Sequence, residues 1–567
     1  MLRRCQGLAL AALIATSLAA APAAAEDRAE VVRIPFPQED GSLTPYTFEV
    51  GYPLVTLIYD TVMWRDAEGV PRPWLAESVT RSADGRRITI RLRPGIRWQD
   101  GRPLTASDVQ FTFEFVAAHP HPRLSQELED IESLHTVDDR TLVIDLKHPS
   151  LGFFDQPLSD VPVLPRHIWQ GLSGDTLAPP GLPVGSGPYR LTGHIPGKSY
   201  TFTANRDYFR GQPLVRTIEV PVIRTAERTF AALRDRRVDM VPASLDDQAA
   251  GAVRGLGVRI AEGDSYLGTV LMFNLTRPPF DDPAARRTIA SALDLDRITD
   301  AISGLGAGGG TSNVPAEDGY LHPSSPWSPD EKLHNLDEAG ARVGFAELGL
   351  PPLRILAPKN DPVRTEIGRQ VVGALQRAGA GAELVELPFR SLARSVGANG
   401  GSPNFQAAIW SAPPLASYDP SFLPAVFGNP FRSALNYSGY RSARFDELAA
   451  KVSDAPTVEA RRSAVADELR LLARDLPVVP LVFPQGAFAY VSSVYDGWIY
   501  VKGSGILDKR SFLPDEARAN PDEGPIGNPL DTSSDSGANL LMYVFFAGVV
   551  ALVIFVIAYA LRARRGP

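Results

Sequence analysis

Residues whose side chains could perform covalent chemistry are few in this sequence. It has no H-E-x-x-H zinc motif, no G-x-S-x-G nucleophile motif and no GxxxxGK(S/T) phosphate-binding loop. Cys5 is the single cysteine, and it lies ahead of an apolar run near the N-terminus. The rest of the chain therefore lacks a thiol nucleophile, a disulfide and a thiolate metal ligand. These patterns predict a protein that binds rather than catalyses and that carries no cofactor.

Four clusters of suggestive residues are better explained by local structure than by chemistry. His119 and His121 are separated by a proline and have no third ligand nearby, which favours a surface loop over a metal site. Residues 304–310, GLGAGGG, do not follow a strand and lack the lysine of a phosphate-binding loop, which favours a flexible loop. The acidic pairs at residues 138–139 and 281–282 are typical of turns and helix caps.

Residues 405–423, FQAAIWSAPPLASYDPSFL, are the strongest candidate for contact with a small ligand. An apolar strand ending at Trp410 is followed by a proline-rich loop, and parallel sheets present binding groups at such strand ends. The candidate ligand-binding residues of this segment are Trp410, Ser411, Ala412, Tyr418 and Asp419. Core packing is an equally good interpretation of Trp410, and a cap or turn before a proline is an equally good interpretation of Asp419.

The elements that would position this loop alternate between strands and helices. Two strand–helix–strand units are predicted, and they occupy Val215–Val222, Ala226–Leu233 and Val238–Val241, then Leu353–Leu356, Pro362–Arg377 and Glu383–Leu387. Further helices are predicted at Ala284–Leu293, Arg444–Val452 and Val458–Leu472, and an apolar strand at Val478–Phe483. Such units build parallel sheets, so the sequence predicts an α/β protein.

One stretch combines these local signals with a resemblance to a known family. A strand ending at Leu92 alternates apolar and polar residues, Asp100-Gly101 forms a turn, and Thr105 with Asp108 forms a capping box that opens a helix. The string LRPGIRWQDGRPLTASDV resembles the signature of the family 5 extracytoplasmic solute-binding proteins, the oligopeptide, dipeptide and nickel receptors of ABC importers. PVGSGPYRL, FNLTRPPFDDPAARRTIASALDLDRI and ARDLPVVPLV, at residues 183–191, 273–298 and 473–482, are similar to later segments of that family.

The resemblance implies a periplasmic-binding-protein-like fold, with two lobes around a hinge and an extra domain. Domain I would comprise about residues 26–53, 184–266 and 484–513, domain II about 54–183, and domain III about 267–483. Phe36, Phe483 and Gln485 fall where the family lines its cleft. Peptide-binding members carry an acid after the tryptophan, which pairs with the ligand's α-ammonium. That position falls here on Pro413, or on Ala416 when aligned from Asp419, so the clamp is missing.

The two ends of the chain predict export and membrane attachment. Residues 1–25 have the charged start, apolar core and A-x-A end of a cleaved signal peptide. Residues 514–538 are rich in Pro, Gly, Ser and Asp and predict a flexible linker. The uncharged, predominantly apolar run 540–561 predicts a single transmembrane helix over residues 539–561, because 20 or so such residues span about 30 Å. Arginines in the tail, residues 562–567, predict a cytoplasmic C-terminus.

The charge of the exported part narrows the class of partner. The formal net charge is −8, and leaving out Arg3, Arg4, Arg562, Arg564 and Arg565, five positive charges, gives −13. An acidic body argues against nucleic acid or anionic lipid as the ligand.

The sequence and the resemblance predict a monomeric, membrane-anchored, extracytoplasmic substrate-binding protein of an ABC importer. It would capture a peptide or another small organic solute by hinge closure and deliver it to permease subunits. It would be held to the cell membrane with its body in the periplasm or at the cell surface. The alternative is a surface receptor or chaperone-like interaction protein with the same fold that feeds no importer.

Overall fold

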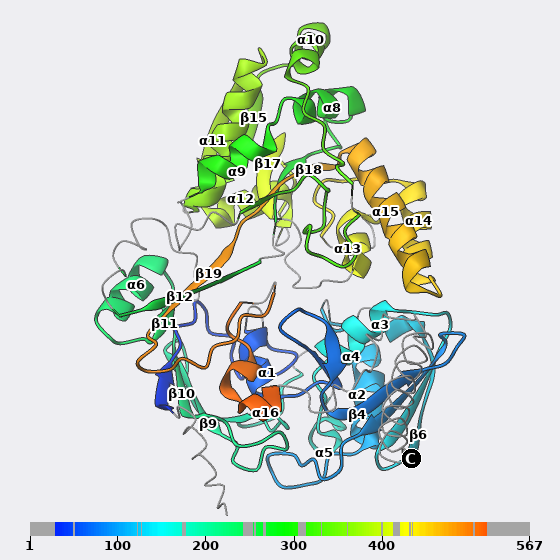
Figure 1. Ribbon diagram of the computed structural model, residues 1–567, viewed down its shortest axis with the longest axis vertical. Helices are drawn as coiled ribbons and strands as arrows, with labels where there is room; N and C mark the ends of the chain where they lie inside the picture. Colours follow the sequence, from blue (N-terminus) through cyan, green and yellow to red (C-terminus); the bar gives the residue numbers. More distant parts are fainter. Residues whose placement is uncertain are drawn as a thin grey trace, which may run out of the picture.

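The computed structural model describes most of the chain between Ala29 and Arg518. The described ranges are 29–48, 51–121, 123–125, 128–172, 177–241, 253, 257–264, 268–303, 313–329, 331–359, 361–398, 401–411, 420–429, 433, 435–502 and 505–518. The predicted signal peptide, the glycine-rich segment 304–310 and the predicted transmembrane segment 539–561 lie outside these ranges. Figure 1 shows a lower lobe, residues 29–263 and 486–518, and an upper lobe, residues 269–483.

Two sheets built from distant segments form one side of the lower lobe. The first has the order β1-β10-β9-β8, and the second has the order β11-β19-β12. In the first sheet β1 and β10 are parallel and the other neighbours antiparallel, whereas the second sheet is antiparallel throughout. The elements are β1 (Ala29–Arg33), α1 (Tyr52–Ile58), β8 (Tyr189–Ile195), β9 (Ser199–Ala204), β10 (Val215–Pro221), α6 (Ala226–Arg234), β11 (Met240–Val241), β12 (Arg259–Gly263) and β19 (Gly486–Tyr490).

One of the two predicted strand–helix–strand units is wrong, because the strand that follows α6 does not pair with β10. The sequence predicts that it returns parallel to β10, but β11 lies in the other sheet and pairs antiparallel with β19. This strand has only two residues, Met240 and Val241, and its partner is about 250 residues further along the chain. Local periodicity could not identify that pairing.

A second domain of the lower lobe is a four-stranded antiparallel sheet, in the order β4-β5-β7-β6, against which α2 packs. The capping box predicted at the start of α2 is present, with Thr105 as N-cap and the Asp108 carboxylate accepting a hydrogen bond from the Thr105 backbone amide at 2.9 Å. The elements are β2 (Met63–Arg65), β3 (Pro71–Pro73), β4 (Ala76–Arg81), β5 (Arg87–Leu92), α2 (Ala106–Ala118), η1 (Leu128–Asp130), β6 (Ile131–Asp138), β7 (Thr141–Leu146), α3 (Gly152–Asp155), α4 (Pro157–Asp160) and α5 (Arg166–Trp169).

The upper lobe is a six-stranded mixed sheet, in the order β14-β18-β13-β17-β15-β16, with helices on both faces. The second predicted strand–helix–strand unit is confirmed, because β15 and β16 are parallel and α11 connects them. One apolar core contains residues of α8 to α11 and the other contains residues of α12 to α15. The elements are β13 (Thr269–Phe273), α8 (Pro283–Ser291), α9 (Leu295–Ile302), β14 (Val314–Pro315), α10 (Glu338–Leu348), β15 (Leu353–Pro358), α11 (Pro362–Arg377), β16 (Ala382–Leu387), α12 (Phe389–Val396), β17 (Ala407–Ser411), η3 (Pro420–Phe422), α13 (Leu423–Phe427), α14 (Ala443–Ser453), α15 (Val458–Asp475) and β18 (Val478–Phe483).

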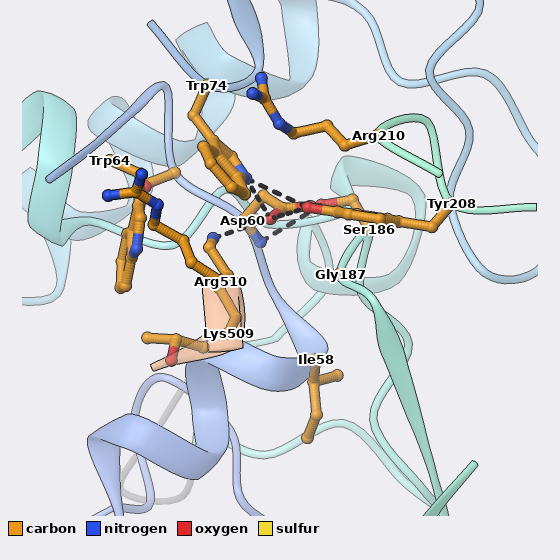
Figure 2. Close-up of polar contacts among 12 residues, drawn as sticks. Ile58, Asp60, Trp64, Trp74, Ser186, Gly187, Tyr208, Arg210, Lys509 and Arg510 are labelled. Carbon is orange, nitrogen blue, oxygen red and sulfur yellow. Dashed lines mark hydrogen bonds and ion pairs between the residues drawn. The ribbon is translucent and has the colours of Figure 1, made fainter. Parts of the chain in front are cut away.

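A buried ion pair ties the C-terminal segment into the lower lobe. Lys509 Nζ lies 2.8 Å from Asp60 Oδ1, and neither side chain is exposed to solvent. Asp60 also accepts hydrogen bonds from Trp74 Nε1 at 2.8 Å, Tyr208 Oη at 2.9 Å and Ser186 Oγ at 3.0 Å, as Figure 2 shows. Burial lowers the pKa of the Lys509 ammonium, and the charge and hydrogen bond of Asp60 oppose that effect.

The C-terminal segment ends in η4 (Lys509–Phe512) and the one-turn helix α16 (Asp515–Arg518). Ala517 is buried, and its carbonyl oxygen accepts a hydrogen bond from Arg210 Nη2 at 2.9 Å. The described structure therefore continues to Arg518, four residues beyond residue 514, where the linker is predicted to start. Within the described ranges, no helix has the length and apolar character needed to cross a membrane.

Candidate functional site

Two chain crossings join the lobes. The chain enters the upper lobe between β12 and β13 and leaves it between Phe483 of β18 and Gly486 of β19. All six strands of the upper sheet lie between these crossings, so the upper lobe is an insertion on two connections. Two short connections are the arrangement that allows hinge motion of one lobe against another.

A close backbone approach marks the lower end of both crossings. Gly263 and Gly486 are paired across β12 and β19, and the Tyr500 ring lies against both. Tyr500 Oη donates a hydrogen bond to the Gly263 carbonyl at 2.9 Å. A Cβ atom on Gly263 would overlap the ring, and one on Gly486 would overlap the hydroxyl. Glycine is therefore required at both positions to leave room for Tyr500.

The predicted ligand-binding residues Trp410, Ser411 and Phe483 lie at one edge of the upper sheet. Ser411 is paired with Thr269, which is paired on its other side with Val482, so β17 and β18 reach the same edge. This edge leads directly into the two crossings. Ala412, Tyr418 and Asp419 lie outside the described residues, and their predicted role stays a prediction.

Trp410 is half-buried in a row of aromatic rings. Its ring lies parallel to that of Phe389, with 5.9 Å between centroids, and meets Tyr437 edge-on at 5.9 Å. Phe389 is 52% exposed, whereas the other side of Trp410 packs against the core shared by α12 to α15. The row offers a partly solvent-accessible aromatic surface at the C-terminal end of three parallel strands, where ligands bind in α/β sheets.

A polar group lies beside Phe483 at the hinge. The Phe483 and His322 rings are 5.0 Å apart, and His322 Nδ1 accepts a hydrogen bond from the Ser324 amide at 3.1 Å. Ser324 Oγ donates to Asp264 Oδ2 at 2.9 Å, which joins the upper lobe to the first crossing. Burial lowers the pKa of His322, with an opposing effect from Asp264.

The remaining predicted residues occupy less accessible positions. Phe36 is 7% exposed and belongs to the core of the lower lobe, where its amide donates to the Pro221 carbonyl at 3.0 Å. Phe483 is also buried. Gln485 is half-buried at the second crossing, and its backbone N–H donates to Asn313 Oδ1 at 2.9 Å. The arrangement brings Trp410, Ser411, Phe483 and Gln485 to the hinge side of the upper lobe.

Sequence reasoning missed Phe389, His322, Asp264 and Tyr500. Phe389 follows β16 at its C-terminal end, so the rule that pointed to Trp410 could also have found it. The other three come together across the crossings from distant parts of the chain, and no local pattern marks them. Among the described residues there is no group of three His, Cys, Asp or Glu side chains suited to hold a metal ion.

An α/β fold with a lobe inserted on two crossings defines the periplasmic-binding-protein class. Residues 70–431 match the profile of bacterial extracellular solute-binding proteins, family 5, in its middle region. The chain belongs to this family of solute-binding proteins. The resemblance found in the sequence is thereby confirmed.

Individual relatives agree with this assignment. A Brucella ovis protein that bears the name of an ABC transporter peptide-binding protein is 26% identical over 372 residues, 64% of this chain and 66% of that protein. The fold is similar to that of the ABC transporter substrate-binding protein CtaP of Listeria monocytogenes, with a TM-score of 0.74 at 20% identity over 86% of this chain and 99% of that one. It is also similar to the oligopeptide-binding protein AppA of Bacillus subtilis in complex with a nonapeptide, with a TM-score of 0.66 at 20% identity over 82% and 95% of the two chains.

Proposed function

We propose that this protein is the extracytoplasmic substrate-binding component of an ABC importer and that it captures a peptide or a related organic solute by closing its lobes. The insertion of the whole upper lobe on two short crossings carries the proposal, because it is the arrangement that a closing receptor needs. The names of the Brucella and Bacillus relatives point to peptides. Delivery of the solute to permease subunits would follow closure.

The ligand-binding surface of this proposal is the hinge-side edge of the upper sheet. Phe389 and Trp410 would stack against an apolar or planar part of the solute, and Ser411 and Gln485 would supply polar contacts. Phe36 and Phe483 would support these residues from the cores of the two lobes. The acid expected from peptide-binding relatives is absent at residues 413 and 416, so a solute without a free α-amine fits as well as a peptide.

Closure on the solute is tested by scattering. We expect mass spectrometry of small molecules released from the purified protein to identify the solute. Adding it back to emptied protein should then lower the radius of gyration measured by small-angle X-ray scattering, because the ligand favours the closed state in which it contacts both lobes. Identical scattering curves with and without saturating solute would contradict the mechanism.

Membrane attachment through residues 539–561 belongs to the same proposal and has its own test. We expect the full-length protein to sediment with membranes and a chain that ends after Arg518 to stay in the soluble fraction. Arg518 is the appropriate end point because Ala517 is buried against the lower lobe, so an earlier truncation would expose the core. Protease added to spheroplasts should remove the body of the full-length protein. A membrane-bound truncated chain would contradict the anchor.

The alternative function is a surface receptor that feeds no importer. A permanent membrane anchor favours it, because a tethered body stays beside its own membrane whether or not a permease is present. The two functions differ in one observation: transport of the identified solute into cells should stop when the protein is deleted only if it serves an importer.

A further inference from the structure

The two lobes touch again at a place remote from the crossings. Arg81, the last residue of β4 in the lower lobe, donates from Nη2 to the carbonyl oxygen of Pro456 in the upper lobe at 3.0 Å. Pro456 lies in the loop that joins α14 to α15. Figure 1 shows the lower ends of these two helices directed at α3 of the lower lobe.

A histidine lies between carboxylates of the two lobes at the same place. His148 Nε2 is 3.0 Å from Asp130 Oδ1 within the lower lobe, and His148 Nδ1 is 3.0 Å from Asp454 Oδ1 in the upper lobe. Both partners are acceptors, so the imidazole can donate to both of them only when it is protonated. Asp130 is largely covered, with 14% of its side chain exposed, and its contact with Nε2 orients the His148 ring within the lower lobe.

An apolar side chain completes this contact. Leu151 precedes α3 in the lower lobe and is 1% exposed. The other buried members of its apolar cluster all belong to the upper lobe, in residues 270–478. Leu151 therefore loses this packing when the lobes move apart, and its exposure to water opposes opening.

We propose that Arg81, His148 and Leu151 of the lower lobe form a clasp that holds the two lobes together without a ligand. Arg81 and His148 contact residues 454–456, and Leu151 packs on the apolar core shared by α12 to α15. The clasp rests on the proposed function in one respect, which is that the lobes open and close. The clasp residues act on the relative position of the two lobes and not on the solute, because they lie at the second contact between the lobes and not at the crossings. A solute that binds the closed state has an apparent affinity proportional to the closed fraction, so the clasp sets that affinity from a distance.

The experiment measures the distance between the lobes in the absence of any solute. Spin labels are attached at Glu132→Cys on β6 and Lys451→Cys on α14, both exposed positions close to the clasp, in full-length protein carrying Cys5→Ser. The chain has one native cysteine, so the labels are specific. Pulsed electron paramagnetic resonance then reports the populations of short and long distances.

We expect Asp454→Asn to reduce the ratio of short to long distances by about two- to fivefold, the range for a partly exposed ion pair. Leu151→Ala should reduce it by at least about tenfold, because a buried apolar contact is lost. Glu447→Gln is the matched control, since it breaks an exposed ion pair with Arg444 inside α14 and touches no residue of the clasp.

The proposal is overturned if Asp454→Asn and Glu447→Gln give the same distance distribution, or if the unaltered protein shows long distances alone. Asp454 is 56% exposed, so its substitution does not threaten folding and keeps the test decisive if Leu151→Ala fails to fold. Failure to bind any solute would contradict the proposed function but would leave this ligand-free measurement unchanged, so the two failures are distinguishable.

Discussion

Lys509→Met is expected to lower the free energy of unfolding of the lower lobe by about 3–5 kcal/mol. The substitution leaves the Asp60 carboxylate fully buried without its cation, although Trp74, Tyr208 and Ser186 continue to donate hydrogen bonds to it. Urea denaturation followed by tryptophan fluorescence provides the measurement. The Lys509 ammonium lies 4.1 Å from the centre of the Trp64 ring and 4.9 Å from that of Trp74, so the probes report on the altered site.

A second substitution separates the lost ion pair from lost packing. Asp60→Asn combined with Lys509→Met removes both charges. The free energy of unfolding of this double variant should fall less than that of Lys509→Met alone, because no unpaired charge stays buried. Lys502→Met is the matched control, since Lys502 forms a surface ion pair with Glu68 and should cost about 0–1 kcal/mol. Equal costs for Lys502→Met and Lys509→Met would show that burial of the ion pair contributes nothing.

The sequence predicts those parts of the fold whose causes are local. The capping box of α2 is present because Thr105 and Asp108 are three residues apart and need no other segment. Asp282 caps α8 as predicted, with its side chain accepting from the Ala284 amide. The parallel unit β15–α11–β16 is confirmed, since β15 and β16 pair in parallel and α11 lies between them in the chain. A strand, a helix and a strand joined by short connections need no distant segment to form such a unit.

The parts that sequence reasoning missed depend on residues that are far apart in the chain. β11 pairs with β19, and Asp60 pairs with Lys509 449 residues later. The contact between Arg81 and Pro456 spans 375 residues. Each of these residues has an ordinary local context, and its partner is fixed by how whole lobes pack. Pairing between distant segments is decided by tertiary structure, so a reading of local patterns cannot supply it.

The candidate site shows the same division. The strand-end rule correctly placed Trp410 and Ser411 at the edge of the upper sheet, because that edge follows from the order of strand and loop. It did not show that Trp410 packs on the core on one side and on the exposed Phe389 ring on the other. From the sequence, core packing and ligand contact are two alternative roles for Trp410. In the structure the Trp410 ring is half-buried, so one side chain can serve both roles.

Replacement of Glu468 is expected to remove a large pH dependence of stability. Glu468 lies on α15 with 0% exposure, and neither carboxylate oxygen has a hydrogen-bond partner among the described residues. Burial raises the pKa of this carboxyl from 4.5 to about 8, against the opposing charge of Arg461. Between these values the folded protein keeps a proton that the unfolded chain has released. The contribution of Glu468 to the free energy of unfolding is therefore fully present below about pH 4.5 and is lost as the pH rises towards 8.

Glu468→Gln keeps the shape of the protonated side chain but does not titrate. Its free energy of unfolding, minus that of the unaltered protein, should increase by about 1.4 kcal/mol per pH unit between roughly pH 5 and 8. Urea denaturation at four pH values across this range measures the slope. Asp467→Asn is the control, because Asp467 is the neighbouring residue on α15 and is 51% exposed beside Arg470. Parallel stability curves for Glu468→Gln and the unaltered protein would mean that Glu468 is already ionised in the folded state, with a cation or water satisfying it.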